Sequence, residues 1–244
     1  MKYFDHAAST GLYPEVIEVL TKSFKEDYPN PAAKHSAGKE CAKKIERARA
    51  NILKGLELPG EGEYELIFTS SATEANNQVI RSVEDDIIYI SGDHPSVTKV
   101  IDEGCGLRYI EEALDAISTE TKLLCISLVN SQSGQILDVN EIAKQAKEQN
   151  PKILVHVDAT QGFAKVPLSL KSSDVDFVSF GAHKMGGPRG IGGLIFRSSL
   201  ASVLKRYLRG GGHEKGLRAS TPPTSLILGL EKACELSFAD LSEK

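Results

Sequence analysis

The sequence predicts an α/β protein in which helices cover both faces of a mainly parallel, mixed sheet, giving three layers. Short apolar runs alternate with helical stretches along the chain, and this alternation is typical of that architecture. The chain has 244 residues, of which 41% are hydrophobic and 25% are charged, as in ordinary globular proteins. No repeat, low-complexity tract or long linker interrupts it, and its length suggests one or two domains.

The elements follow from hydrophobic spacing and local stop signals. Six apolar runs are predicted to form short buried strands: residues 65–68, 86–90, 123–129, 153–157, 176–180 and 193–196. Helices are predicted over residues 14–27, 37–55, 72–82, 139–149 and 224–240. The first begins with a proline, which suits the first helical position. The second carries an apolar stripe and ends at a glycine.

Charge, hydropathy and cysteine spacing exclude several classes of protein. The net charge of −4 and the isoelectric point of about 5.9 argue against a nucleic-acid binder, which presents a basic patch. No apolar run approaches the roughly 20 residues of a membrane span, and the N-terminus has no signal-peptide pattern. The cysteines lie far apart without CxxC spacing, so we expect no metal site, and reduced thiols in the cytoplasm.

The first candidate ligand-binding motif is TSSATEANN (69–77), which follows a predicted strand directly. Parallel sheets bind ligands at the carboxyl ends of their strands. Ser70, Ser71 or Thr73 can cap the helix that begins near Ala72, and the free N–H groups of its first turn would face an anion such as phosphate. Taken alone, the motif is more often a plain capped helix.

Two further motifs follow later strands. HVDATQ (156–161) places Asp158 where a metal, a ribose hydroxyl or a protonated ring nitrogen could bind, with helix capping as the alternative. SFGAHKMGGPRGIGG (179–193) places Lys184 just after a buried strand. A desolvated lysine loses its proton readily and can form a Schiff base, although a lone lysine is more often a surface residue. The glycines lead into a strand, which argues against a dinucleotide-binding loop.

The combination of these motifs is more specific than any one of them. GGGHEKGLRAST (210–221) is uninformative alone, and His94 beyond another strand is alone more often structural. Together, an anion-binding helix start, an aspartate at a strand end and a lysine beyond a later strand are the parts of a pyridoxal phosphate site.

At this point the sequence resembles a known family, the class V aminotransferases among the fold-type I pyridoxal phosphate enzymes, and within it the cysteine desulfurases. YFDHAAST (3–10) is similar to the family's opening strand and turn, and NPAAKHSAG (30–38) to its Asn-Pro…His…Gly segment. SSATEANN, HVDATQ, SFGAHKMGGPRGIGGL and GGGHEKGLRAST follow in family order. The interval of 26 residues from Asp158 to Lys184 also fits. The resemblance implies that residues 1–244 form the large, cofactor-binding domain of these enzymes.

The resemblance implies a role for each matching residue. Lys184 would be the Schiff-base lysine and proton carrier, and Asp158 would pair with the ring nitrogen. His94 would stack on the ring and assist proton transfer, and Gln161 would bind the phenolic oxygen. The remaining residues would bind phosphate: Ala72, Thr73 and His183 in the same chain, and Thr221 in the other subunit of a homodimer.

The sequence also departs from the family pattern. Gly181 stands where the family has a serine, so one phosphate donor is missing. The family's asparagine falls on Ser131, with Asn130 one place off. The family's smaller C-terminal domain, which carries the sulfur-accepting cysteine and a substrate-binding arginine, has no counterpart in these residues. We expect Cys41, Cys125 and Cys234 to be packed and Cys105 to be the exposed thiol, in a glycine-flanked turn.

These expectations favour a cysteine desulfurase-like transferase that acts on L-cysteine and leaves alanine. The sulfur-accepting thiolate would come from a second chain, which could also supply the small domain, or sulfide would be released directly. Two alternatives remain: another pyridoxal phosphate lyase or aminotransferase acting on a small amino acid, and a non-catalytic dimeric scaffold of the same fold. The retained Lys184, Asp158, Gln161 and His94 weigh against the scaffold.

Overall fold

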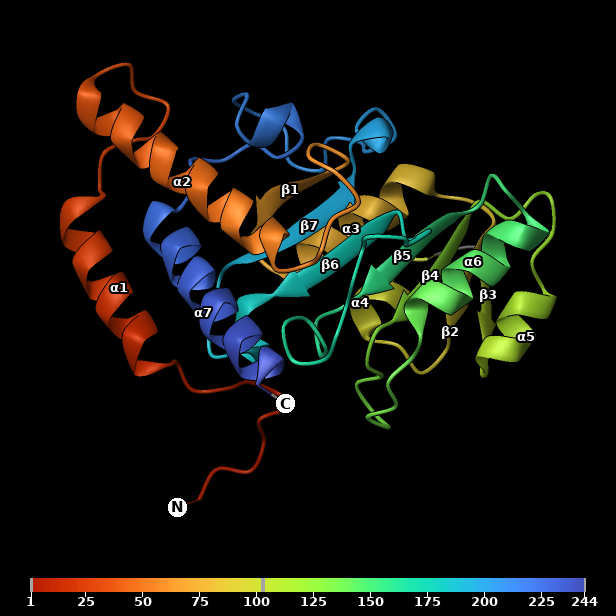
Figure 1. Ribbon diagram of the computed structural model, residues 1–244. Helices are drawn as coiled ribbons and strands as arrows, with labels where there is room; N and C mark the ends of the chain where they lie inside the picture. The colour runs from red at the N-terminus through yellow and green to blue at the C-terminus, as the bar shows by residue number, and fades with distance from the viewer. Residues whose placement is uncertain (1, 102–103, 244) are drawn as a thin grey trace.

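A computed structural model describes residues 2–101 and 104–243, and within them one seven-stranded sheet has the order β1-β7-β6-β5-β4-β2-β3 (Figure 1). β7 is antiparallel to β1 and to β6, and the other pairs are parallel. The predicted mixed, mainly parallel sheet is therefore confirmed. The strands are β1 (Tyr64–Thr69), β2 (Ile87–Ile90), β3 (Gly104–Leu107), β4 (Leu123–Ser127), β5 (Leu154–Asp158), β6 (Phe177–Gly181) and β7 (Gly192–Arg197).

Helices cover both faces of the sheet (Figure 1). On one face α2 (Ser36–Lys54), α5 (Ile110–Asp115), α6 (Val139–Gln149) and α7 (Thr224–Ser242) bury apolar side chains against the strands. On the other face α3 (Ala72–Val83) and α4 (Pro95–Thr98) do the same. The predicted three layers are present, and each of the five predicted helices forms within one or two residues of its expected bounds.

The outermost helix, α1 (Pro14–Glu26), packs on α7 and not on the sheet. Val16 and Leu20 of α1 are buried against Ala233, and burying such side chains stabilises the fold by about 1.5–3 kcal/mol each. Gly229 permits the close approach, because a Cβ at that position would lie 2.8 Å from Leu20. A residue with a side chain at this position would push α1 away from α7.

Two local predictions are wrong, and two short helices were not predicted. Residues 104–107 form the edge strand β3, not a turn around Cys105. Its glycines have no side chains that could show the alternation of a strand. They also let the ring of Tyr89 lie across β3, since a Cβ on Gly106 would be 2.7 Å from that ring. The short helices α4 and α5 were not predicted, because one or two turns carry too little periodicity. Residues 3–10 contain a turn and no strand.

This topology places the ends of β4, β5 and β6 beside the start of α3. Ser127 and Asp158 are register partners on β4 and β5, and Asp158 pairs with Ser179 on β6. The segment before α1 crosses the loop after β6, where the backbone N–H of Thr10 donates to the oxygen of His183 at 2.9 Å. The edge formed by these strand ends therefore lies between α3 and the N-terminal segment.

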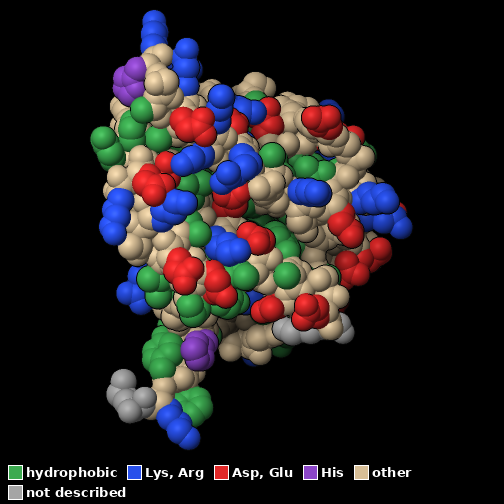
Figure 2. Space-filling view, turned by 60° about the vertical axis from the view of Figure 1, so that its left-hand side comes forward, with side chains coloured by type: hydrophobic (Ala, Val, Ile, Leu, Met, Phe, Trp, Pro, Cys, Tyr) green, Lys and Arg blue, Asp and Glu red, His purple; other side chains and the backbone are tan. Residues whose placement is uncertain are grey.

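The surface has mixed charge. Figure 2 shows acidic and basic side chains interspersed on the face that it turns forward, with the N-terminal segment extending below. None of the helices in the described ranges is both long enough and apolar enough to cross a bilayer.

Candidate active site

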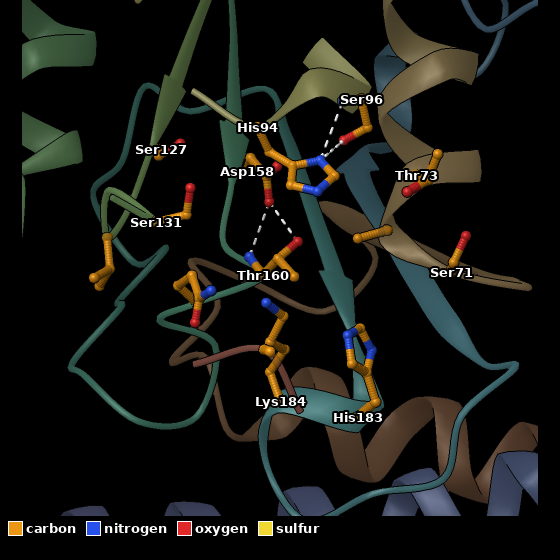
Figure 3. Close-up of a pocket in the computed structure, with 14 residues that line it drawn as sticks. Ser71, Thr73, His94, Ser96, Ser127, Ser131, Asp158, Thr160, His183 and Lys184 are labelled. Carbon is orange, nitrogen blue, oxygen red and sulfur yellow. Dashed lines mark hydrogen bonds between the residues drawn. The ribbon is translucent and has the colours of Figure 1, made fainter. Parts of the chain in front are cut away.

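A cavity of about 360 Å³ opens at the carboxyl ends of β4, β5 and β6, beside the start of α3 (Figure 3). Such an edge is where open α/β sheets bind ligands. Every site residue expected from the sequence lies on its wall except Thr221: Ala72, Thr73, His94, Asp158, Gln161, His183 and Lys184. Segments more than 100 residues apart in the sequence thus meet at one space.

The carboxylate of Asp158 has a fixed orientation at the end of β5. One oxygen, Oδ2, accepts a hydrogen bond of 2.8 Å from the side-chain amide of Asn76. The other, Oδ1, accepts from the backbone N–H of Thr160 at 2.9 Å and from its hydroxyl. A buried carboxylate held by several donors presents its charge in one direction, here along the cavity wall.

Lys184 lies in a short 3-10 turn, residues 182–184, that directly follows β6. Its half-buried side chain points toward Asp158 and His94 (Figure 3), and Nζ donates to the backbone oxygen of Ala7 at 2.6 Å. Burial lowers the pKa of Lys184, while the carboxylates of Asp158 and Asp5 act in the opposite direction. The amine therefore releases its proton more readily than an exposed lysine.

His94 caps α4 and connects to Asp158 through two residues that the sequence did not single out. Its Nδ1 accepts from the backbone N–H of Ser96 at 3.1 Å and lies 2.8 Å from the Ser96 hydroxyl. Asn76 donates to that hydroxyl and to Asp158, each at 2.8 Å. This arrangement assigns the ring proton of His94 to Nε2. Asn76 lies within the TSSATEANN motif, one turn into α3, and its place in the motif is the signal that could have found it.

The start of α3 forms an anion cup, by which we mean residues 71–73 with the free N–H groups of the first turn. Ser71 is the N-cap, and its hydroxyl accepts from the N–H of Glu74 at 3.2 Å. His183 stands beside the cup, and burial lowers its pKa, with Lys184, Arg189 and other cations adding to the effect. A helix start with unpaired donors is an anion-binding arrangement.

Two glycines near the anion cup differ in what they permit. Gly192 lets β7 pass the start of α3, since a Cβ there would lie 2.9 Å from the backbone of Ser71 and 3.1 Å from the N of Ala72. Gly181 has room: a Cβ there would lie 3.5 Å from Nδ1 of His183 and 3.6 Å from the N of Ala72. A small polar side chain at position 181 would therefore fit at the edge of the anion cup.

The two candidates for the family's asparagine, Asn130 and Ser131, lie in the loop after β4 and have different surroundings. Ser131 lines the cavity. Asn130 instead holds the turn that follows, because its Oδ1 accepts from the N–H groups of Gln132 and Ser133, each at 3.0 Å. Its side-chain amide donates to the backbone oxygen of Gly92. Ser131 is the one of the two that a ligand in the cavity would contact.

Two buried ionisable groups behind the wall were missed by the sequence reasoning. Asp93 accepts from the hydroxyl of Ser127 at 2.6 Å, and its other oxygen has no partner among the described residues. Burial, with Asp158 nearby, raises its pKa to about 7. His156 is fully buried, with Nε2 2.8 Å from the Ser179 hydroxyl, and burial lowers its pKa to about 4. Two features of the sequence could have identified them. Asp93 directly precedes His94, and His156 lies two residues before Asp158 on the same strand.

Thr221 and the cysteines lie outside the cavity. Thr221 is exposed in the segment that leads into α7. Cys41, Cys125 and Cys234 are buried, as expected, and Cys105 is exposed on the edge strand β3. Burial raises the pKa of each buried thiol. No cysteine lines the cavity among the residues that the structure describes.

Comparison with known proteins gives consistent results. The aminotransferase class-V family pattern matches residues 2–242. Proteins named cysteine desulfurase IscS from Rickettsia akari and Rickettsia prowazekii are 32% identical to this chain and match 99% of it. The chain spans 63% of the length of these relatives.

Solved structures agree with the sequence comparison. A NifS-like protein matches with a TM-score of 0.91 at 31% identity, covering 99% of this chain and 70% of the other. The NifS-like protein of Rickettsia africae gives 0.89 at 30% identity, covering 98% and 69%. A structure described as SspA in complex with cysteine gives 0.87 at 31% identity, covering 96% and 72%. The chain therefore belongs to the class V aminotransferase family.

Proposed function

We propose that the chain binds pyridoxal phosphate and is the cofactor-binding part of a cysteine desulfurase that mobilises sulfur from L-cysteine and leaves alanine. The observation that carries this proposal is the convergence of Lys184, Asp158 and the anion cup on one cavity (Figure 3). The class V aminotransferases are pyridoxal phosphate enzymes, and the relatives named above are cysteine desulfurases.

The donor set of the cavity fits pyridoxal phosphate. The group needs an amine for its aldehyde, an anion for its ring nitrogen and donors for its phosphate. Lys184 supplies an amine with a lowered pKa, Asp158 supplies a carboxylate held by Asn76 and Thr160, and the anion cup supplies N–H groups. A cavity of about 360 Å³ lies in the range of small-molecule sites.

Each residue on the wall then has a proposed role. When bound, pyridoxal phosphate supplies an electron sink for the carbon that bears the substrate's amino group. Lys184 would hold the group covalently and carry the α-proton of the substrate on Nζ. Asp158 would hold a proton on the ring nitrogen, and His94 would lie against the ring and assist proton transfer. The remaining proposed contacts are Gln161 to the phenolic oxygen and Ala72, Thr73 and His183 to the phosphate.

The sulfur acceptor is proposed to come from another polypeptide, or to be a small-molecule thiol reductant, which supplies the two electrons needed if sulfide is released directly. Cys105, the exposed thiol, is on the edge strand β3 and does not line the cavity. In the transfer reaction a thiolate forms a bond to the substrate sulfur while the carbon–sulfur bond breaks. The bonding electrons stay with carbon, which gains a proton to become alanine, and the acceptor becomes a persulfide.

We further propose that the chain acts as a homodimer in the cytoplasm. Thr221 is exposed and outside its own cavity, which leaves it free to contact the phosphate in a second copy, as the family resemblance implies. The four cysteines are all free, as expected in a reducing compartment.

The test is product analysis with the purified protein, pyridoxal phosphate and L-cysteine. With an added thiol reductant, which supplies the two electrons that sulfide formation requires, equal amounts of alanine and sulfide from the protein would support direct release. Without the reductant, a persulfide on an added second protein would support transfer. The Lys184→Ala variant must form neither product. A keto acid together with aminated cofactor would instead identify an aminotransferase. A protein that binds no cofactor would overturn the proposal in favour of a scaffold.

A further inference from the structure

A negative charge lies directly beside the anion cup. Glu74 lies in the first turn of α3, and its Oε2 accepts from the backbone N–H of Ser70 at 2.8 Å. Its own N–H donates to the Ser71 hydroxyl, so Ser71 and Glu74 each accept a backbone N–H at the start of the helix. A carboxylate here stabilises the helix start, but the same charge opposes a phosphate bound to the adjacent N–H groups.

Arg218 neutralises this carboxylate through a two-point contact. Its Nε lies 2.8 Å from Oε1 of Glu74, and its Nη2 lies 3.2 Å from Oε2. The side chains are only 12% and 8% exposed, so water screens the pair weakly. Burial raises the pKa of Glu74, but the bonds from Arg218 and Ser70 outweigh burial, and the pKa lies below its usual value. The carboxylate therefore stays charged and depends on Arg218 for its counter-charge.

The loop that carries Arg218 is anchored to α3 and to α2. One turn further along α3, the amide of Gln78 donates to the backbone oxygen of Leu217 at 3.1 Å. Glu214, earlier in the same loop, binds the buried Arg49 of α2 at 2.9 Å. Thr221 follows Arg218 by three residues in the chain. The ion pair thus joins the start of α3 to the segment that carries Thr221, which is proposed to contact the phosphate in a second copy of the chain.

We infer that Arg218 is a positioning residue for phosphate binding, which cancels the charge of Glu74 so that the anion cup can accept the phosphate of pyridoxal phosphate. This inference rests on the proposed function and adds a residue to it. Arg218 does not line the cavity, so it acts through Glu74. The role is electrostatic, and it predicts an effect that depends on the phosphate and on the charge of Glu74.

The experiment compares binding of pyridoxal phosphate and of pyridoxal, which lacks the phosphate, by absorbance or fluorescence titration. Arg218→Met should weaken binding of pyridoxal phosphate by about tenfold, an order of magnitude typical of a partly buried unit charge left unpaired. Pyridoxal should bind this variant as it binds the unaltered protein. Arg218→Met combined with Glu74→Gln should recover most of the lost affinity, because glutamine keeps an acceptor for Ser70 without the charge. Arg218→Lys should retain most of the affinity for pyridoxal phosphate, because lysine keeps the positive charge.

A matched control comes from the same loop. Lys215 pairs with Glu65 of β1 at 2.8 Å, whereas Glu74 pairs with Arg218, so Lys215→Ala should leave both affinities unchanged. The melting temperature of each variant without cofactor separates a folding defect from a binding defect. Equal losses for pyridoxal and pyridoxal phosphate, or no recovery in the double variant, would overturn the inference alone. Failure of the unaltered protein to bind pyridoxal phosphate would overturn the proposed function and the inference with it.

Discussion

Lys184 and Gln161 donate hydrogen bonds to the same acceptor, the backbone oxygen of Ala7, at 2.6 Å and 2.9 Å respectively. Ala7 belongs to the N-terminal segment, which is fixed across the loop after β6 by Thr10. The amine and the amide, which both line the cavity, are therefore held by the same stretch of backbone. A group that engages the Lys184 amine has to replace Ala7 as its partner.

The rate of cofactor attachment to Lys184 should rise with pH, because only the neutral amine attacks an aldehyde. Burial lowers the pKa of Lys184 from 10.5, so the neutral fraction grows as pH rises, with a midpoint below that value. Asp158 opposes this shift, and Asp158→Asn should move the midpoint further down. Stopped-flow absorbance from neutral to alkaline pH measures both. A midpoint at or above 10.5, or one that Asp158→Asn leaves unmoved, contradicts the prediction.

A hydroxyl at position 181 should strengthen cofactor binding. A Cβ there meets His183 and Ala72 only at ordinary contact distances of 3.5–3.6 Å, so Gly181→Ser should fold normally. The added donor to the phosphate should tighten binding by about tenfold, the scale of one hydrogen bond to a charged group. Gly181→Ala adds the same carbon without the hydroxyl and should bind the cofactor as the unaltered protein does. Identical affinities for the two variants would count against the anion cup as the phosphate site.

The stability of the fold should depend on pH through two buried groups whose effects on stability run in opposite directions. Asp93 has its pKa raised from 3.8 to about 7, so between these values the native state binds more protons and stability falls as pH rises. His156 has its pKa lowered from 6.5 to about 4, so in that window the unfolded chain binds more protons and stability rises with pH. The two effects oppose each other over most of the acidic range.

Asp93→Asn should remove the first effect and leave the second. Asparagine resembles the protonated carboxyl, so the variant should match the unaltered protein at low pH. Above pH 7 it should be more stable by about 2–4 kcal/mol, the scale of a pKa shift of this size. Urea unfolding at acidic pH and at mildly alkaline pH measures the difference. A difference that does not change with pH would show that Asp93 is not the titrating group.

Arg49→Met should destabilise the fold strongly. The side chains of Arg49 and Glu214 are 9% and 4% exposed, and removing one partner of a buried pair typically lowers stability by about 3–5 kcal/mol. Arg47 offers a matched control in the same helix, because it pairs with Glu231 while 59% exposed. Arg47→Met should therefore change stability by less than about 1 kcal/mol. Similar urea midpoints for the two variants would contradict this difference.

The fold could be predicted where hydrophobic residues recur at a helical or strand period and where particular residues mark the ends of an element. Helix α2 has a buried stripe that includes Ile45 and Ile52, and β4 and β5 are short, mostly apolar runs. The edge strand β3 could not be predicted, because Gly104 and Gly106 have no side chains whose alternation would indicate a strand. Its pairing with β2 is set by tertiary contact, and that contact is invisible in a local window.

The candidate site was predictable to the extent that its residues follow strands. Asp158 and Lys184 directly follow buried runs, and the ends of parallel strands share one edge of a sheet. Asn76 and Arg218 were missed because their importance depends on partners 82 and 144 residues away. Asp93 was missed because burial, which raises its pKa, is a property of the folded chain.

The most direct test of cofactor binding at Lys184 is the visible absorption spectrum of the purified protein with pyridoxal phosphate, before and after addition of L-cysteine. We expect a yellow band that is absent in Lys184→Ala and that shifts when L-cysteine is added. The melting temperature of Lys184→Ala without cofactor should stay close to that of the unaltered protein, because Lys184 is only half-buried. A protein with no such band, or a band that persists in Lys184→Ala, would contradict the assignment of this cavity as a pyridoxal phosphate site.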